Sequence, residues 1–163
     1  MNFKTISLVV MSVALFAMAS TACDVLGGGG TYKIGLLSPQ TGPIAVYAPG
    51  FEDAANVAIA ELNDNEDGNV FELVVADSGC DGTQAATAAQ TLIDSGVVGI
   101  VGAACSGATL GAIAVASEAG IPMVSYASTS PAVTSAEDNG YLFRVVPSDA
   151  QQAVALTAVV ADG

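Results

Sequence analysis

The sequence has no histidine, no tryptophan and only three basic residues among its 163. Without histidine there is no Ser-His-Asp triad, and the commonest general base and metal ligand is missing. Sixteen acidic residues leave a formal net charge of −13. Such a surface repels phosphate backbones, so we expect no nucleic-acid partner. Hydrophobic residues nevertheless make up 52% of the chain, which is enough to fill the core of one domain.

The motifs of phosphate and dinucleotide binding are missing as well. Gly99, Gly102 and Gly107 do not have the GxGxxG spacing, and no phosphate loop of the GxxxxGK type occurs. Asp77 and Asp81 could suggest acid–base work or a cation site. At a strand end and a helix start they are more simply turn and cap residues. We therefore expect a binding protein that is not an enzyme and takes no cofactor or metal.

Residues 1–22 have the pattern of a secretory signal, in which Lys4 precedes the apolar stretch Ile6–Ala19 and small residues precede Cys23. The apolar stretch is too short for a membrane span. Cys23 and the glycine-rich tether at 23–30 resemble the start of a bacterial lipoprotein. Lipidation of Cys23 would anchor an exported protein to the membrane, and we favour it. The alternative is ordinary cleavage near Ala22, which leaves Cys23 unpaired.

Export bears on the two remaining cysteines, Cys80 and Cys105. In an oxidising compartment such a pair predicts a disulfide, and two cysteines without histidine make a poor zinc site. We expect a structural crosslink.

Short apolar runs alternate with amphipathic segments along the rest of the chain. The runs predict strands at Tyr32–Leu37, Phe71–Ala76, Val97–Val101, Met123–Tyr126 and Tyr141–Val146. Helices are expected from Asp81 or Thr83 through Ile93, over Gly107–Glu118 with Leu110, Ile113 and Ala114 inward, and from about Asp149. Another has the apolar face Phe51, Ala54, Ala55, Ala58, Ile59 and Leu62. This order predicts an α/β fold with a parallel sheet and helices on both faces.

Small or hydroxyl-bearing residues follow each predicted strand, and those ends meet at one edge of an open sheet. Ser106, after Val97–Val101 and at a helix start, is suited to an anionic group such as a carboxylate. The simpler interpretation is that Ser106 only caps its helix. Taken alone, Ser128 and Thr129 are ordinary loop residues, and Tyr47 is more simply a packing tyrosine.

Four stretches, taken in order, resemble the amino-acid-binding proteins of bacterial ABC importers, the leucine/isoleucine/valine-binding type with the type I periplasmic-binding-protein fold. They are Tyr32–Pro43 with Tyr47 after it, Asp77–Asp81 with Ala104–Ser106, Ser125–Pro131, and Tyr141–Arg144. The resemblance implies two lobes that close over a ligand. Residues 31–147 would be an incomplete first lobe, Val145–Ser148 the crossing, and residues 148–163 the start of the second lobe.

The resemblance also implies a ligand site. Ser106 and Thr129 would hold the α-carboxylate through hydroxyl and backbone groups, and the carbonyl of Ala127 would accept from the α-ammonium. Tyr47 would lie at the cleft mouth. Ser128 occupies a place often held by a small residue, and its hydroxyl leaves a change in ligand preference open. Cys80 and Cys105 match the disulfide framework of the family.

The implied function is capture of an amino acid, with a branched-chain one as first choice, in the periplasm or at the outer face of the cytoplasmic membrane. Delivery would be to an ABC permease and its ATPase. Alternatives are a signalling-receptor ectodomain, a binder of amides, urea or aromatic acids, and an enzyme on a flavodoxin-like sheet. Because the second lobe supplies the other wall of the cleft, we expect the 163-residue chain alone to bind weakly or not at all.

Overall fold

The computed structural model describes residues 29–64 and 68–162. The proposed signal at 1–22, Cys23 and most of the tether lie outside the described residues. The strands are β1 (Thr31–Ser38), β2 (Val70–Asp77), β3 (Val97–Val101), β4 (Met123–Ser125) and β5 (Leu142–Arg144). The α-helices are α2 (Ala48–Asn63), α3 (Gly82–Asp94), α4 (Ser106–Glu118), α5 (Pro131–Thr134) and α6 (Asp149–Asp162), and a 3₁₀ turn, η2, covers Ala45–Tyr47.

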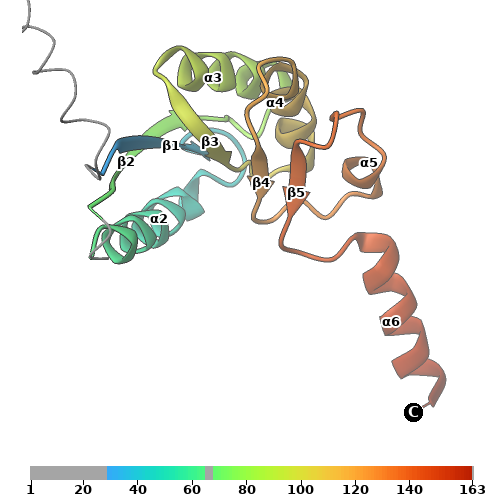
Figure 1. Ribbon diagram of the computed structural model, residues 1–163. Helices are drawn as coiled ribbons and strands as arrows, with labels where there is room; N and C mark the ends of the chain where they lie inside the picture. Colours follow the sequence, from blue (N-terminus) through green and yellow to red (C-terminus); the bar gives the residue numbers. More distant parts are fainter. Residues whose placement is uncertain (1–28, 65–67, 163) are drawn as a thin grey trace, which may run out of the picture.

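The five strands form one parallel sheet in the order β2-β1-β3-β4-β5 (Figure 1). The predicted α/β class and all five strands are therefore confirmed. The last two strands are shorter than expected, since β4 ends at Ser125 and β5 covers only Leu142–Arg144. The chain first moves outward from β1 to β2 and then returns to the other side of β1 with β3. This reversal is a topological switch point between β1 and β3.

Helices cover both faces of the sheet, with α3 and α4 on one side and α2 on the other (Figure 1). The main core lies under α3 and α4, where Leu37, Leu92, Ile100 and Met123 are at most 2% exposed. Alanines fill the contact between these two helices and let their backbones approach closely. A side chain on Gly111 would begin 2.1 Å from the carbonyl oxygen of Gly82, so glycine is required there.

Two predicted helix faces are wrong in detail. On α2 only Phe51, Ala55 and Ile59 of the predicted face are half-buried, whereas Ala54, Ala58 and Leu62 are exposed. The reason is that, in the described part of the chain, α2 packs chiefly against β1 and β2, so a single narrow stripe is covered. On α4 Ile113 is buried, but Ala114 is exposed, because the buried stripe of this helix runs through Ala112, Ile113 and Ala116.

Side-chain hydrogen bonds cap the starts of α3, α5 and α6. Of the two predicted cap residues for α3, Asp81 is the N-cap, and its carboxylate accepts from the N–H groups of Thr83 and Gln84. The short helix α5 was not predicted, although Ser130 caps it and Pro131 occupies its first turn. At the start of α6 the Ser148 hydroxyl accepts from Ala150 N–H, and the Gln151 side chain accepts from Ser148 N–H.

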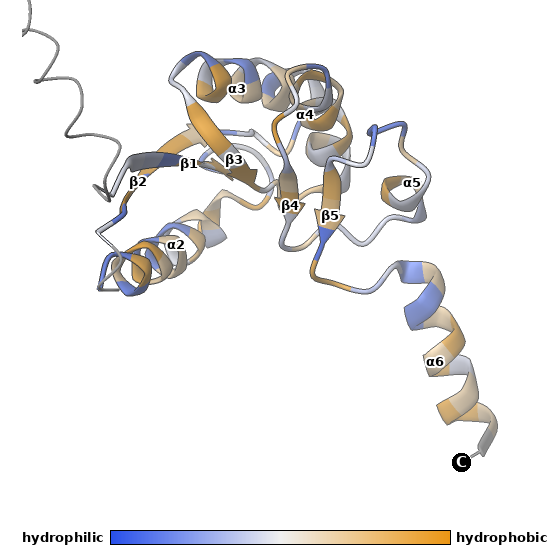
Figure 2. Cartoon of the chain, in the orientation of Figure 1, coloured by the Kyte–Doolittle hydropathy of each residue, from blue (hydrophilic) through white to orange (hydrophobic). Residues whose placement is uncertain are grey.

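Helix α6 projects from the rest of the molecule, and much of its surface is hydrophobic (Figure 2). Val154, Leu156, Val159 and Val160 are 65–72% exposed. Within residues 29–64 and 68–162, no helix has the length and apolar character that crossing a membrane requires.

Candidate ligand-binding site

The loops after β1 and β3 lie at the switch point, where open parallel sheets bind ligands. Ser106 is the first residue of α4 and is half-buried; Cys105, directly before it, occupies the N-cap position. The helix start therefore adds first-turn N–H groups that have no partner within the helix. A helix N-terminus also carries a partial positive charge. The alternative in which Ser106 is merely the cap does not match this placement.

The structure brings Ser106 to the loop that carries Thr129. The Ser106 hydroxyl oxygen accepts from the N–H of Ser130 at 3.2 Å. Accepting uses a lone pair and leaves the hydroxyl proton of Ser106 available to a ligand oxygen. Thr129 is half-buried, and its carbonyl accepts from the N–H of Asp149 at 2.8 Å. The two residues predicted to hold a carboxylate are thus on adjoining segments.

Ser128 points into the protein and away from solvent. It is 0% exposed, and its hydroxyl lies 2.8 Å from the Thr109 hydroxyl and 3.1 Å from the carbonyl oxygen of Ala103. The hydroxyl of Ser125 reaches the same carbonyl at 2.7 Å. These hydrogen bonds hold the loop after β4 against the residues that follow β3. The Ser128 hydroxyl therefore has a structural role. Thr109, a hydroxyl among buried alanines of α4, belongs to this network and was not singled out from the sequence.

Tyr47 belongs to a row of aromatic rings beside the switch point. Its ring centre lies 6.5 Å from that of Phe51, which in turn lies 4.9 Å from that of Tyr126. Tyr47 is 61% exposed, so it is available at the surface rather than packed away. Ala127, next to Tyr126, is half-buried. The predicted roles of Tyr47 and Ala127 toward a ligand remain predictions.

Tyr126 is a neutral hydrogen-bond donor in this row. Its hydroxyl donates to the carbonyl oxygen of Leu37 at 3.1 Å. Burial, with the negative charge of Glu52 in addition, raises the pKa of Tyr126 to about 12. Glu52 itself accepts from the hydroxyl of Ser38 at 2.8 Å and from the side chain of Gln40 at 3.0 Å. These contacts join the loop after β1 to the start of α2, a link that the sequence pattern did not indicate.

The predicted disulfide between Cys80 and Cys105 is confirmed, with the two Cα atoms 5.3 Å apart. It joins the loop after β2 to the residue before Ser106. Asp77 and Asp81 are turn and cap residues, as the simpler interpretation holds. Among the residues that the structure describes, no group of three or more potential ligands could hold a metal ion.

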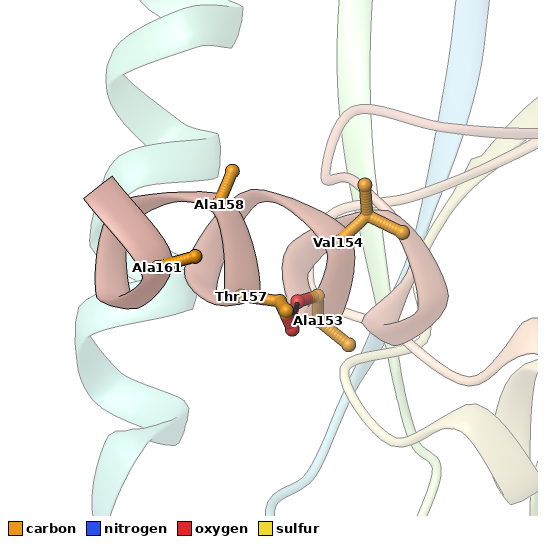
Figure 3. A pocket seen from close by; sticks show the side chains of 5 residues that line it. All are labelled: Ala153, Val154, Thr157, Ala158 and Ala161. Atoms are coloured by element: carbon orange, nitrogen blue, oxygen red, sulfur yellow. Dashed lines mark hydrogen bonds between the residues drawn. The ribbon is translucent and has the colours of Figure 1, made fainter.

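The surface hollows lined by described residues include one along α6 and one at the start of α2. One of about 450 Å³ runs along α6 and is lined by Ala153, Val154, Thr157, Ala158 and Ala161 (Figure 3). Its one hydroxyl, on Thr157, is bonded to the carbonyl of Ala153 at 2.7 Å. The other, of about 370 Å³, lies beside Gln40, Glu52 and Asp53 at the start of α2. Neither contains Ser106 or Thr129.

A parallel α/β sheet with hydroxyl groups and a helix start at its switch point has the arrangement with which open α/β folds bind small ligands. The chain belongs to the periplasmic binding protein family, whose family model matches residues 31–163. Solved relatives include substrate-binding and solute-binding proteins of ABC transporters.

Individual relatives agree with this membership. The leucine-, isoleucine-, valine-, threonine- and alanine-binding protein of Pseudomonas aeruginosa is 34% identical over 87% of this chain and 37% of its own length. The substrate-binding protein LivJ of Streptococcus pneumoniae, solved with isoleucine, is 34% identical with a TM-score of 0.66, over 73% of this chain and 34% of that one. A solute-binding protein of Rhodopseudomonas palustris, solved with 3,4-dihydroxybenzoic acid, is 26% identical with a TM-score of 0.64. The match covers 72% of this chain and 32% of that one. The chain thus spans about a third of the length of these relatives.

Proposed function

We propose that this chain forms the carboxylate-binding part of an exported protein that captures an amino acid, a branched-chain one by preference, for an ABC importer. The observation that carries the proposal is the contact between the Ser106 hydroxyl and the loop of Thr129 at the switch point. Leucine, isoleucine and 3,4-dihydroxybenzoic acid share only one charged group, a carboxylate. A site built from hydroxyl and N–H donors at a helix start fits that group.

In this proposal the hydroxyl groups of Ser106 and Thr129 donate to the two carboxylate oxygens of the ligand. The N–H groups of the first turn of α4 add to them. The carbonyl of Ala127 accepts from the α-ammonium group, and Tyr47 borders the ligand at the mouth of the cleft. Ser128 supports the loop from behind through its bonds to Thr109 and Ala103.

The proposal also covers export, membrane anchoring, the division into lobes and the transporter partners. Residues 1–22 direct export, Cys23 is lipidated, and residues 23–30 tether the folded part to the membrane. Residues 31–147 form the ligand-binding lobe and residues 148–163 begin a second lobe. The permease and ATPase of an ABC importer are the partners.

The test removes the two hydroxyl groups together, as Ser106→Ala with Thr129→Val, in the gene product expressed at its full length. Each hydrogen bond to a charged group contributes about 1.5–3 kcal/mol, so we expect the loss of both to lower leucine affinity by about 100-fold to 10,000-fold. Calorimetry with leucine, isoleucine, valine, urea, glutamine and 4-hydroxybenzoate also identifies the ligand class.

The control carries the same two changes at exposed hydroxyl groups outside the strand-end loops, Ser135→Ala with Thr87→Val. The control should bind as the parent does. If Ser106→Ala with Thr129→Val also leaves the affinity unchanged, the proposed carboxylate site is wrong.

A further inference from the structure

One of the three basic residues of the sequence lies directly behind the proposed carboxylate loop. Arg144, at the end of β5, donates through Nη1 to the carbonyl oxygens of Ser130 at 2.9 Å and Ser128 at 3.4 Å. Its Nη2 donates to the hydroxyl of Thr134 in α5. The chain has a net charge of −13, yet the half-buried guanidinium of Arg144 binds backbone oxygens of the loop at 128–130.

These bonds fix which way the loop peptides face. In a trans peptide the C=O and the next N–H point in opposite directions. When the Ser128 carbonyl turns toward Arg144, the N–H of Thr129 must turn away from it. The next peptide is held as well, because Ser130 N–H donates to Ser106 and the Thr129 carbonyl accepts from Asp149.

From this arrangement we infer that Arg144 is a positioning residue for carboxylate recognition. Its guanidinium orients the Ser128–Thr129 peptide so that the Thr129 N–H faces the ligand, and its positive charge polarises that N–H toward the carboxylate. The planar fork of arginine suits the task, since it reaches two carbonyls and a hydroxyl at once. The inference rests on the proposed function.

The chain supplies a matched control for the loss of a positive charge. Lys33 in β1 also donates to a backbone carbonyl, that of Ser95 at 3.0 Å, but Ser95 follows α3 away from the carboxyl ends of the strands. Lys33→Gln and Arg144→Gln therefore change the net charge equally and each break a bond from a cation to a carbonyl. Arg144→Lys keeps the charge and removes the fork.

The experiment measures the affinity of the full-length gene product and these variants for leucine and for leucinamide, which lacks the carboxylate. We expect Arg144→Gln to lower leucine affinity about 10-fold relative to Lys33→Gln, and Arg144→Lys to fall between them. Leucinamide affinity should change little. The preference for leucine over leucinamide should therefore fall with Arg144, which general destabilisation would not cause.

Equal leucine affinity in Arg144→Gln and Lys33→Gln would overturn the role of Arg144 while leaving the proposed function intact. An equal fall for leucine and leucinamide would overturn it too, because the loss would then be structural. If the parent protein binds no carboxylate ligand, the proposed function fails and this inference fails with it. Should Arg144→Gln not fold, Arg144→Lys decides between the same outcomes.

Discussion

At the scale of single residues, one carboxylate joins two strand-end loops to α3. Asp77, the last residue of β2, accepts from the N–H and hydroxyl of Thr41 at 3.1 and 2.6 Å, and from Gly79 and Gln84 at 2.9 Å each. Burial is the largest single influence and acts to raise the pKa of Asp77. The hydrogen bonds from Thr41, Gly79 and Gln84 together outweigh it, so the pKa lies below its ordinary value of 3.8.

This lowered pKa makes stability depend on pH in a definite direction. The ionised form is favoured by the folded chain, so the contribution of Asp77 is complete above the unfolded pKa of 3.8 and is lost as the pH falls through the folded pKa. We expect the stability difference between the parent chain and Asp77→Asn to shrink as the pH falls below about 5 and to go on shrinking until the pH is below the folded pKa. Urea unfolding at each pH measures it.

Asp53→Asn, on the exposed side of α2, is the control for the change in net charge. A difference between the parent and Asp77→Asn that is the same at neutral pH and in acid would contradict the account of Asp77.

At the scale of elements, the disulfide fixes the distance between the loop after β2 and the start of α4. Cys80 and Cys105 are 25 positions apart. Closing a loop of that size lowers the entropy of the unfolded chain and so stabilises the folded state by about 3 kcal/mol. We expect Cys80→Ala with Cys105→Ala to lower the free energy of unfolding by about that amount, measured in urea against the oxidised parent. Dithiothreitol should bring the parent to the level of the variant. Equal stability of the oxidised parent and the variant would show that the crosslink contributes nothing.

The strands could be predicted from the sequence because each is a short apolar run between turn residues, and parallel strands buried on both faces keep that pattern. Which face of a helix is buried, and which way a loop side chain points, could not be predicted from the sequence. The buried face of α2 is narrower than the apolar pattern of its sequence, because among the described residues this helix packs chiefly on β1 and β2. The roles of Ser128 and Thr109 depend on contacts between distant segments. Likewise Arg144 resembles any surface arginine until the loop at 128–130 is seen against it.

At the scale of the whole molecule, the packed part and α6 differ sharply in what they bury. Helix α6 extends away from the rest of the molecule (Figures 1 and 2). The core residues between the sheet, α3 and α4 are almost fully enclosed, whereas the large apolar side chains of α6 lie in solvent. Stability must therefore come from the sheet and its covering helices, because burial of apolar surface is the main favourable contribution to folding.

The same substitution at two leucines tests this division. Leu92 in α3 is 0% exposed and Leu156 in α6 is 65% exposed. Leu92→Ala removes buried methyl groups and leaves a cavity, so we expect it to lower the free energy of unfolding by about 2–5 kcal/mol. Leu156→Ala removes side-chain atoms that are already in water, and surface changes of this kind stay within about 0.5 kcal/mol. Urea denaturation of both variants against the parent measures the contrast, with the slope of the transition as a check that the same surface unfolds. A loss at Leu156 as large as that at Leu92 would mean that α6 is packed within the folded chain rather than exposed.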